Sequence, residues 1–89
     1  MRERDLEHYL VELADRSRCF LRKVRWVGRN GAPDRLLIDL NGNITWVELK
    51  APGKNPTAQQ ELEHNRMRVY GQKVVVLDSI DAIEELFNA

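Results

Sequence analysis

The stretch Asp34–Lys50, which reads DRLLIDLNGNITWVELK, predicts a β-hairpin. Two runs rich in β-branched and other apolar residues, 34–40 and 44–49, flank the turn-forming segment Asn41-Gly42-Asn43. The hairpin is therefore the centre around which the rest of the fold is expected to pack.

The register of the hairpin decides which side chains share a face. With a three-residue loop, Asn41–Asn43, Leu36 faces Glu48 and Asp34 faces Lys50. Side chains alternate with a period of two along a strand, so Asp34, Glu48 and Lys50 then project from one face at one end of the hairpin. A two-residue loop would instead turn Asp34 to the face opposite Glu48.

Helix and strand patterns surround the hairpin. Helices are expected at 2–16, at 57–70 and, in a short final segment, after Ser79 as the N-cap, with further strands at 20–27 and 72–77. Glycine and proline mark loops at 28–33 and 51–56. The nearly continuous apolar strand 72–77 is expected to be buried on both faces. The order αβββαβα predicts an α/β protein with one α+β mixed sheet and helices on its faces.

Apolar side chains at helical spacing predict which residues face the core. They are Leu6, Tyr9, Leu10, Leu13, Ala14, Leu62, Val69, Tyr70, Ile80, Ile83, Leu86 and Phe87. Trp26 and Trp46 are expected in the core or at an interface rather than as platforms for base stacking.

Length and composition exclude several classes of protein. The chain of 89 residues is expected to form one domain, residues 1–89, and its balance of 43% apolar and 31% charged residues is ordinary for a globular protein. The sequence contains neither a run of about 20 apolar residues, which a membrane span needs, nor a signal-peptide pattern. A single cysteine, Cys19, excludes an intramolecular disulfide and favours an intracellular location. Scattered His and Cys residues make a structural zinc site improbable.

Positive charge gathers in one part of a chain with no net charge. Seven of the fourteen Lys and Arg residues lie between Arg16 and Arg35, where Asp34 is the one acid. Such a band can form a phosphate-binding surface on a neutral protein, although a charge run by itself is more often a solvated strand and loop.

The converging charges at the end of the hairpin are typical of a divalent-metal site. Mg²⁺ takes a few carboxylate oxygens and keeps several waters and substrate phosphate. Asp34 and Glu48 can each supply an oxygen, and the backbone carbonyl of Leu49 lies between Glu48 and Lys50. Lys50 can orient an attacking water or neutralise charge on a phosphate. The alternative is a salt bridge at the edge of a strand pair.

A wider pattern resembles a known nuclease family. Pro33-Asp34 followed by Glu48-Leu49-Lys50 matches the PD-(D/E)XK signature. The longer strings GRNGAPDRL, residues 28–36, and ELKAPGK, residues 48–54, resemble the VRR-NUC branch of that superfamily. This branch includes small stand-alone proteins of bacterial viruses and nuclease domains of some repair enzymes. The resemblance covers nearly the whole chain and implies a restriction-endonuclease-like αβββαβ core with a short C-terminal helix.

The resemblance also implies roles for single residues. An acid on the first helix, Glu7 with Glu3 as the alternative, joins Asp34, Glu48 and the Leu49 carbonyl in holding Mg²⁺ or Mn²⁺. Lys50 assists the nucleophile. Gln60 matches a glutamine of the family, although Thr57-Ala58-Gln59-Gln60 also fits a capping box. The glycines Gly28 and Gly31 would let their loop approach the substrate backbone. The residues expected to bind DNA are Arg22, Lys23, Arg29, Arg35 and Lys54.

The function implied is metal-dependent endonucleolytic hydrolysis of DNA phosphodiester bonds, with branched (Holliday-type) junctions as a target. Two-fold junctions favour a homodimer, and the location implied is the cytoplasm of a bacterial or phage-infected host cell. Two rival hypotheses are a non-catalytic nucleic-acid-binding module on the same fold and a structural partner subunit. The set Asp34, Glu48 and Lys50 argues against both, because neither role needs an ammonium beside two acids.

Overall fold

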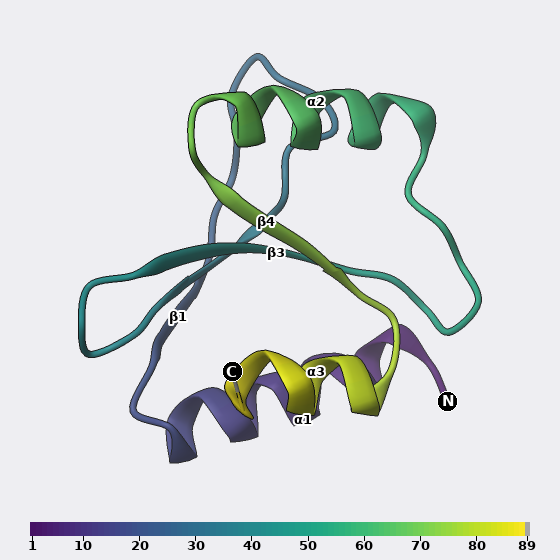
Figure 1. Cartoon of the computed structure of the whole chain (residues 1–89). Helices are drawn as coiled ribbons and strands as arrows, with labels where there is room; N and C mark the ends of the chain where they lie inside the picture. The colour runs from purple at the N-terminus through teal and green to yellow at the C-terminus, as the bar shows by residue number, and fades with distance from the viewer. Residues whose placement is uncertain (89) are drawn as a thin grey trace.

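A mixed four-stranded sheet separates two layers of helices in the computed structural model, which describes residues 1–88 (Figure 1). The elements follow the predicted order and are α1 (Glu3–Arg16), β1 (Phe20–Lys23), β2 (Arg35–Ile38), β3 (Ile44–Leu49), α2 (Ala58–Val69), β4 (Lys73–Leu77) and α3 (Ile80–Asn88). The strand order is β1-β2-β3-β4, with β1, β2 and β3 antiparallel and β4 parallel to β3. The crossover through α2 makes the last pair parallel.

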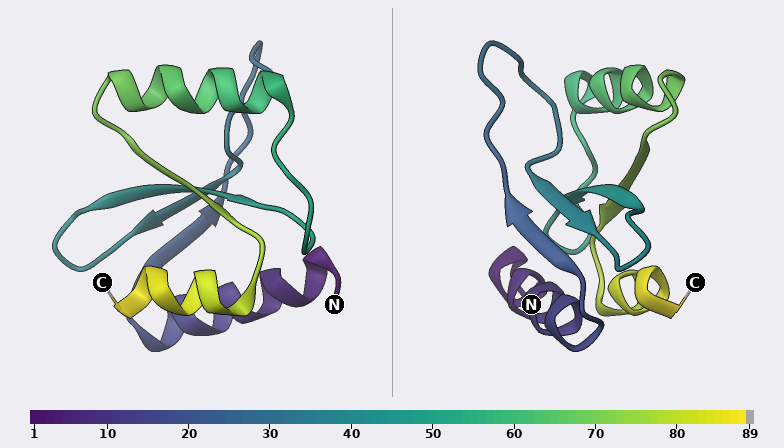
Figure 2. Two further views of the ribbon diagram at one scale, coloured as in Figure 1. Left: turned by 45° about the vertical axis from the view of Figure 1, so that its right-hand side comes forward. Right: turned by 90° about the vertical axis from the view of Figure 1, so that its left-hand side faces the viewer.

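The hydrophobic core lies between one face of the sheet and the pair α1 and α3. These helices run side by side beneath the sheet, while α2 lies on the other face (Figure 2). The odd-numbered residues of β2 and β3 point toward α1 and α3, which is why they are buried. The core cluster consists of Leu6, Leu10, Ala14, Leu37, Val47, Leu49, Leu77 and Ile83, with Tyr9 and Leu13 packed against it.

Helix α2 packs on β4 with a different face from the one expected. Its buried residues are Glu63 and His64, whereas Leu62, Val69 and Tyr70 are exposed. The prediction that these three apolar residues face the core is therefore wrong. Tyr70 is the C-cap of α2, and Gly71, at φ 83°, turns the chain away from the helix there.

The hairpin register differs from the predicted one by two residues. Arg35 pairs with Val47 and Ile38 pairs with Ile44, so the loop is Leu40–Gly42 rather than Asn41–Asn43. The Asp39 carboxylate accepts hydrogen bonds from the backbone N–H groups at 41 and 43, each 2.9 Å long, and this fixes the turn. The loop still has an odd length, so the assignment of side chains to faces is unchanged. Continuing the register by one residue sets Asp34 directly opposite Glu48.

The first strand ends earlier than predicted, at Lys23, and β2 covers Arg35–Ile38 rather than 34–40. The backbone N–H of Val24 donates to the Asp34 carbonyl at 2.8 Å, and beyond this bond the chain leaves the sheet as the glycine loop. Strand β4 is an edge strand, but helices cover both of its faces, which buries Val74 and Leu77 and half-buries the two valines between them. None of the helices in residues 1–88 is long and apolar enough to cross a membrane.

Candidate active site

Two carboxylates lie near each other at the end of the hairpin where its strands enter and leave. Asp34 immediately precedes β2, and Glu48 is the fifth residue of β3. Both belong to the even-numbered set, which the odd loop keeps on one face. Asp34 keeps 42% of its side chain exposed, and Glu48 is half-buried. The pair therefore forms an acidic centre that solvent can reach.

The electrostatics of Glu48 are unusual for a glutamate. Burial, followed by the negative charge of Asp34, raises its pKa from the ordinary 4.5 to about 7. Lys50 and Arg35 oppose this change, and Glu3 adds to it. Burial therefore destabilises the charged form of Glu48 by more than the nearby cations Lys50 and Arg35 stabilise it. A glutamate held in this way favours a strong positive charge beside it.

Lys50 lies two residues after Glu48 and is half-buried. Its backbone N–H donates to the Leu77 carbonyl at 3.0 Å, which extends the β3–β4 pairing by one residue. Within residues 1–88, no carboxylate lies within 4 Å of its ammonium, so the salt bridge considered as an alternative is not formed. The Lys50 charge nevertheless lowers the pKa of Glu48, so it acts on the acidic centre through space.

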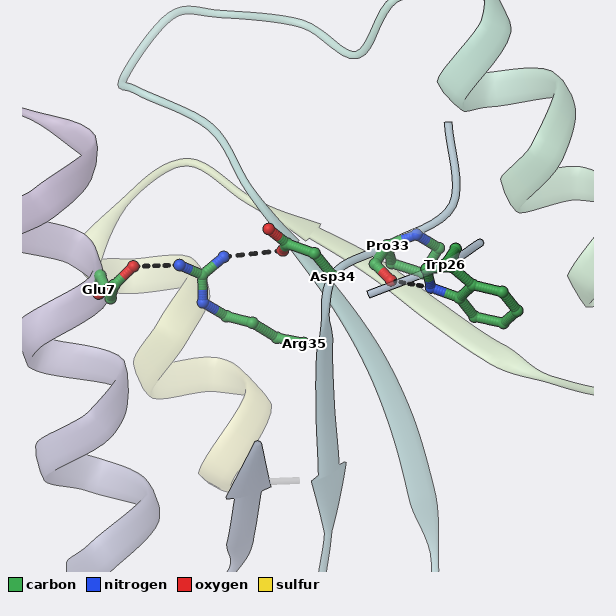
Figure 3. A network of polar contacts seen from close by, with 5 residues as sticks. All are labelled: Glu7, Trp26, Pro33, Asp34 and Arg35. Carbon is green, nitrogen blue, oxygen red and sulfur yellow. Dashed lines mark hydrogen bonds and ion pairs between the residues drawn. The ribbon is translucent and has the colours of Figure 1, made fainter. Parts of the chain in front are cut away.

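A chain of polar contacts links α1 to Asp34 through Arg35. The Arg35 guanidinium donates from Nη2 to the Glu7 carboxylate and from Nη1 to the Asp34 carboxylate, the latter at 2.8 Å (Figure 3). The Arg35 side chain is 7% exposed, whereas its two acid partners, Glu7 and Asp34, keep 39% and 42% of their side chains exposed. This arrangement holds the Asp34 carboxylate in one orientation.

This network bears on the expected DNA contact of Arg35 and on the choice between Glu7 and Glu3 as the acid of the first helix. Arg35 was predicted to contact DNA, but it points toward α1 because it is an odd-numbered residue of β2. It therefore positions Asp34 instead of reaching a phosphate. The Glu7 carboxylate binds Arg35, while the alternative acid, Glu3, is exposed and adds to the charge that Glu48 experiences.

Gln60 closes the predicted capping box at the start of α2. Its side-chain oxygen accepts from the Thr57 backbone N–H at 2.9 Å, and its own N–H donates to the Thr57 hydroxyl at 3.1 Å. The capping box expected from Thr57-Ala58-Gln59-Gln60 is thus formed. A catalytic role would require Gln60 to leave this cap.

The glycine loop packs against α2. A Cβ on Gly31 would lie 2.7 Å from the backbone oxygen of Gln59, and the φ of Gly31 is 86°, so glycine is required there. The loop was expected to approach substrate through its glycines. Its close approach at Gly31 is to α2, and nothing lies within 4 Å of a Cβ on Gly28.

A basic cleft of about 570 Å³ leads to Asp34. Its lining includes Lys23, Arg25 and Arg29 together with the glycine loop. Of the other residues expected to bind DNA, Arg22 stacks its guanidinium 3.9 Å above the Phe20 ring. Lys54 is exposed in the loop after β3.

The sequence patterns did not predict three polar contacts beside the cleft. Glu63 of α2 accepts from Arg29 of the glycine loop at 2.9 Å, and this contact lowers the pKa of Glu63. The Trp26 indole N–H donates to the Pro33 carbonyl at 2.7 Å (Figure 3). Arg35 bridges two acids. The adjacent Asp34-Arg35 pair was a signal for the last contact, whereas nothing local linked Glu63 to a loop 34 residues away.

The metal-binding potential of the site rests on a pair of acids. No group of three or more His, Cys, Asp or Glu side chains that could hold a metal ion occurs within residues 1–88. Asp34 and Glu48, with the carbonyl of Leu49 beside them, are the groups that could do so at this centre. Such a set leaves room for waters and for substrate oxygens.

Comparison with known proteins identifies the family. The sequence matches no family model. A solved structure described as a VRR_NUC domain superposes with a TM-score of 0.89 and 33% sequence identity, covering 97% of this chain and 94% of that one. "Putative nuclease p44" of Acyrthosiphon pisum secondary endosymbiont phage 1 is 43% identical over 81 residues, which are 91% of this chain and 87% of that protein. The chain belongs to the VRR-NUC family of nucleases.

The VRR-NUC assignment confirms the resemblance predicted from residues 28–36 and 48–54. It also confirms the fold, because the mixed sheet with three helices matches the restriction-endonuclease-like architecture expected of a VRR-NUC domain. The acidic centre thus lies on the strands that carry the signature from which the family was predicted.

Proposed function

We propose that this VRR-NUC protein is a DNA endonuclease that uses Mg²⁺ or Mn²⁺ to hydrolyse phosphodiester bonds. The observation that carries the proposal is the acidic centre. Asp34 and Glu48 lie opposite each other on one face of the sheet, and burial together with the negative charge of Asp34 raises the pKa of Glu48 to about 7. A non-catalytic DNA-binding module would gain nothing from two acids beside a phosphate-binding cleft.

The donor set fits a hard divalent cation. Mg²⁺ is commonly held by one or two carboxylates, with waters and substrate phosphate as its other ligands. Asp34, Glu48 and the Leu49 carbonyl are the proposed protein ligands. Glu7 is the proposed acid from α1, which would join them only when its ion pair with Arg35 opens. When bound, the cation supplies positive charge for a phosphodiester oxygen and for the attacking water.

The remaining residues act on the substrate and on each other. Arg35 holds Asp34 toward the centre through its 2.8 Å contact and shares its charge with Glu7. Lys50, which is not engaged by either acid, is the proposed stabiliser of the negative charge that develops on the phosphate. Gln60 is the proposed partner for substrate or water if the helix cap opens.

The proposed substrate is DNA, bound mainly through phosphates. Lys23, Arg25 and Arg29 line the cleft that leads to Asp34, and charged contacts of this kind position a backbone without reading its sequence. Arg22 and Lys54 are proposed as further phosphate contacts. Branched (Holliday-type) DNA is the proposed target and a homodimer the proposed assembly, because a two-fold junction offers two equivalent cleavage positions.

The test is cleavage of a labelled four-way junction and of a linear duplex with the same arm sequences. We expect product in Mg²⁺ or Mn²⁺, none in EDTA, and faster cleavage of the junction. Equal rates on the two substrates would contradict the junction preference alone. An absence of cleavage of either DNA with both metals would leave a non-catalytic binding module as the better account.

A further inference from the structure

A second cleft, lined by aromatic residues, adjoins the basic cleft at the α2 side of the sheet. It has a volume of about 410 Å³ and is lined by Trp26, Arg29, Trp46, Glu63, Arg66, Met67, Tyr70 and Gln72. We call it the aromatic cleft. Trp26 and Arg29 also line the basic cleft that contains Asp34, so the two clefts are neighbours.

The two indole rings of the aromatic cleft are held in fixed orientations. Trp26 donates to the Pro33 carbonyl at 2.7 Å, and Trp46 donates to the side-chain oxygen of Gln72 at 3.0 Å. The ring centroids lie 5.3 Å apart with an angle of 50° between the planes. Because each N–H group has a partner within the protein, the apolar ring surfaces form the wall of the cleft.

Tyr70 contributes an aromatic ring that the fold does not use. Its side chain follows the last turn of α2, and the residue is 84% exposed. Its neighbour Val69 is 82% exposed but does not line the cleft. A ring in this position adds nothing to the core and is available to a planar ligand.

The charges at the edge of the aromatic cleft suit a phosphate group. The buried carboxylate of Glu63 accepts from Arg29 at 2.9 Å and from Arg66 at 3.4 Å. Two guanidinium groups around one carboxylate leave a net positive charge, and more than half of each arginine side chain is exposed. Glu63 thereby fixes both arginines at the edge without neutralising them.

We propose that the aromatic cleft binds an unpaired base of a DNA strand whose backbone runs through the basic cleft. Flat aromatic walls beside exposed guanidinium groups are the surface that single-stranded nucleic acid recognises, through base stacking and phosphate contacts. Trp26 donates a hydrogen bond to the Pro33 carbonyl, and Asp34 is the next residue in the chain. A base bound beside Trp26 would therefore lie close to the bond to be cleaved. The proposal rests on the proposed function in one respect, that DNA is the substrate, and it extends that function to strands with unpaired bases.

Intrinsic fluorescence tests the proposal directly, because the chain has two tryptophans and both line the aromatic cleft. An oligothymidine of about ten nucleotides, within the usual range of single-strand site sizes, is titrated into the protein in EDTA. We expect the tryptophan fluorescence to be quenched. An oligomer of the same length with abasic residues carries the same phosphates and should bind more weakly, with little quenching.

Tyr70→Ala and Val69→Ala form a matched pair of exposed substitutions. We expect Tyr70→Ala to weaken oligothymidine binding by roughly 5-fold or more, as the loss of a base-stacking ring does, and Val69→Ala to leave it unchanged. Equal affinities of the two variants, or equal quenching by the abasic oligomer, would overturn the proposal. A shift in oligomeric state of Tyr70→Ala in sedimentation, with unchanged oligothymidine affinity, would assign the cleft to a second copy of this chain and also overturn it.

The readout is independent of catalysis because it needs no metal. Quenching without cleavage of any DNA would support the aromatic cleft and contradict the endonuclease. Cleavage without quenching would do the reverse.

Discussion

Replacing Glu48 by glutamine should stabilise the metal-free protein above neutral pH while removing a proposed metal ligand. Burial and the charge of Asp34 raise the pKa of Glu48 to about 7 in the folded state, whereas an unfolded glutamate has its ordinary value of 4.5. The folded state therefore holds the proton more tightly. Between about pH 4.5 and 7 this group makes the protein less stable as the pH rises, and above pH 7 the full cost is present.

The size of the effect follows from the same difference. One pKa unit corresponds to about 1.4 kcal/mol, so the change from 4.5 to about 7 sets an upper bound of about 3 kcal/mol. The carboxylate is partly exposed, and solvent screening reduces this to ~1–2 kcal/mol. Glutamine has nearly the same shape and no charge. For a domain of this size, each kcal/mol moves the midpoint of thermal unfolding by ~4–8 °C.

The assay is thermal and urea unfolding of the wild type and Glu48→Gln in EDTA at several pH values. We expect equal stability near pH 4.5 and a growing advantage for the variant up to about pH 7.5. Glu85→Gln, a change at an exposed acid of α3, should show no such trend. Added Mg²⁺ should stabilise the wild type more than Glu48→Gln, because only a ligand that binds the folded state raises its stability. A variant no more stable than the wild type at pH 8 in EDTA would refute the reasoning.

Three further changes test other parts of the site. Gly31→Ala should lower the free energy of unfolding, measured in urea, by ~2–4 kcal/mol, because the added Cβ clashes with Gln59 and the φ is positive. Gly28→Ala has the positive φ without the clash and should lower it by about 1 kcal/mol. Equal losses would contradict the packing role of Gly31. Lys50→Met should keep a melting temperature close to wild type but reduce single-turnover cleavage by ~10²-fold or more, and wild-type turnover would exclude a catalytic lysine. Neutralising Arg22 together with the cleft residues Lys23 and Arg29 should flatten the slope of log K against log salt by roughly 0.9 for each phosphate that the variant no longer binds. An unchanged slope would put the DNA elsewhere.

The hairpin illustrates how far the sequence predicts the site. Period-two alternation and an odd loop were enough to put Asp34 and Glu48 on one face, because a shift of two residues leaves the faces unchanged. The choice of loop residues depended on the Asp39 carboxylate, which accepts from the N–H groups at 41 and 43. The sequence prediction chose the loop from the turn-forming residues Asn41-Gly42-Asn43 and did not include the hydrogen bonds of Asp39.

The errors arose where tertiary contacts override local patterns. Helix α2 carries few apolar residues. The face that it buries contains Glu63 and His64, whereas Leu62 and Tyr70 are exposed. Arg35 belonged to a basic band along the chain, yet strand alternation turned it inward to two acids. A count of basic residues along the sequence does not show which of them face solvent and which face the inside of the protein.

The most direct test of the central claim is single-turnover cleavage of labelled DNA in Mg²⁺ by the wild type and Asp34→Ala, with DNA affinity measured separately in EDTA. The acidic centre predicts that Asp34→Ala folds, binds DNA with similar affinity and gives no cleavage above background. Cleavage by Asp34→Ala at the wild-type rate would contradict the assignment of Asp34 and Glu48 as the centre of the active site.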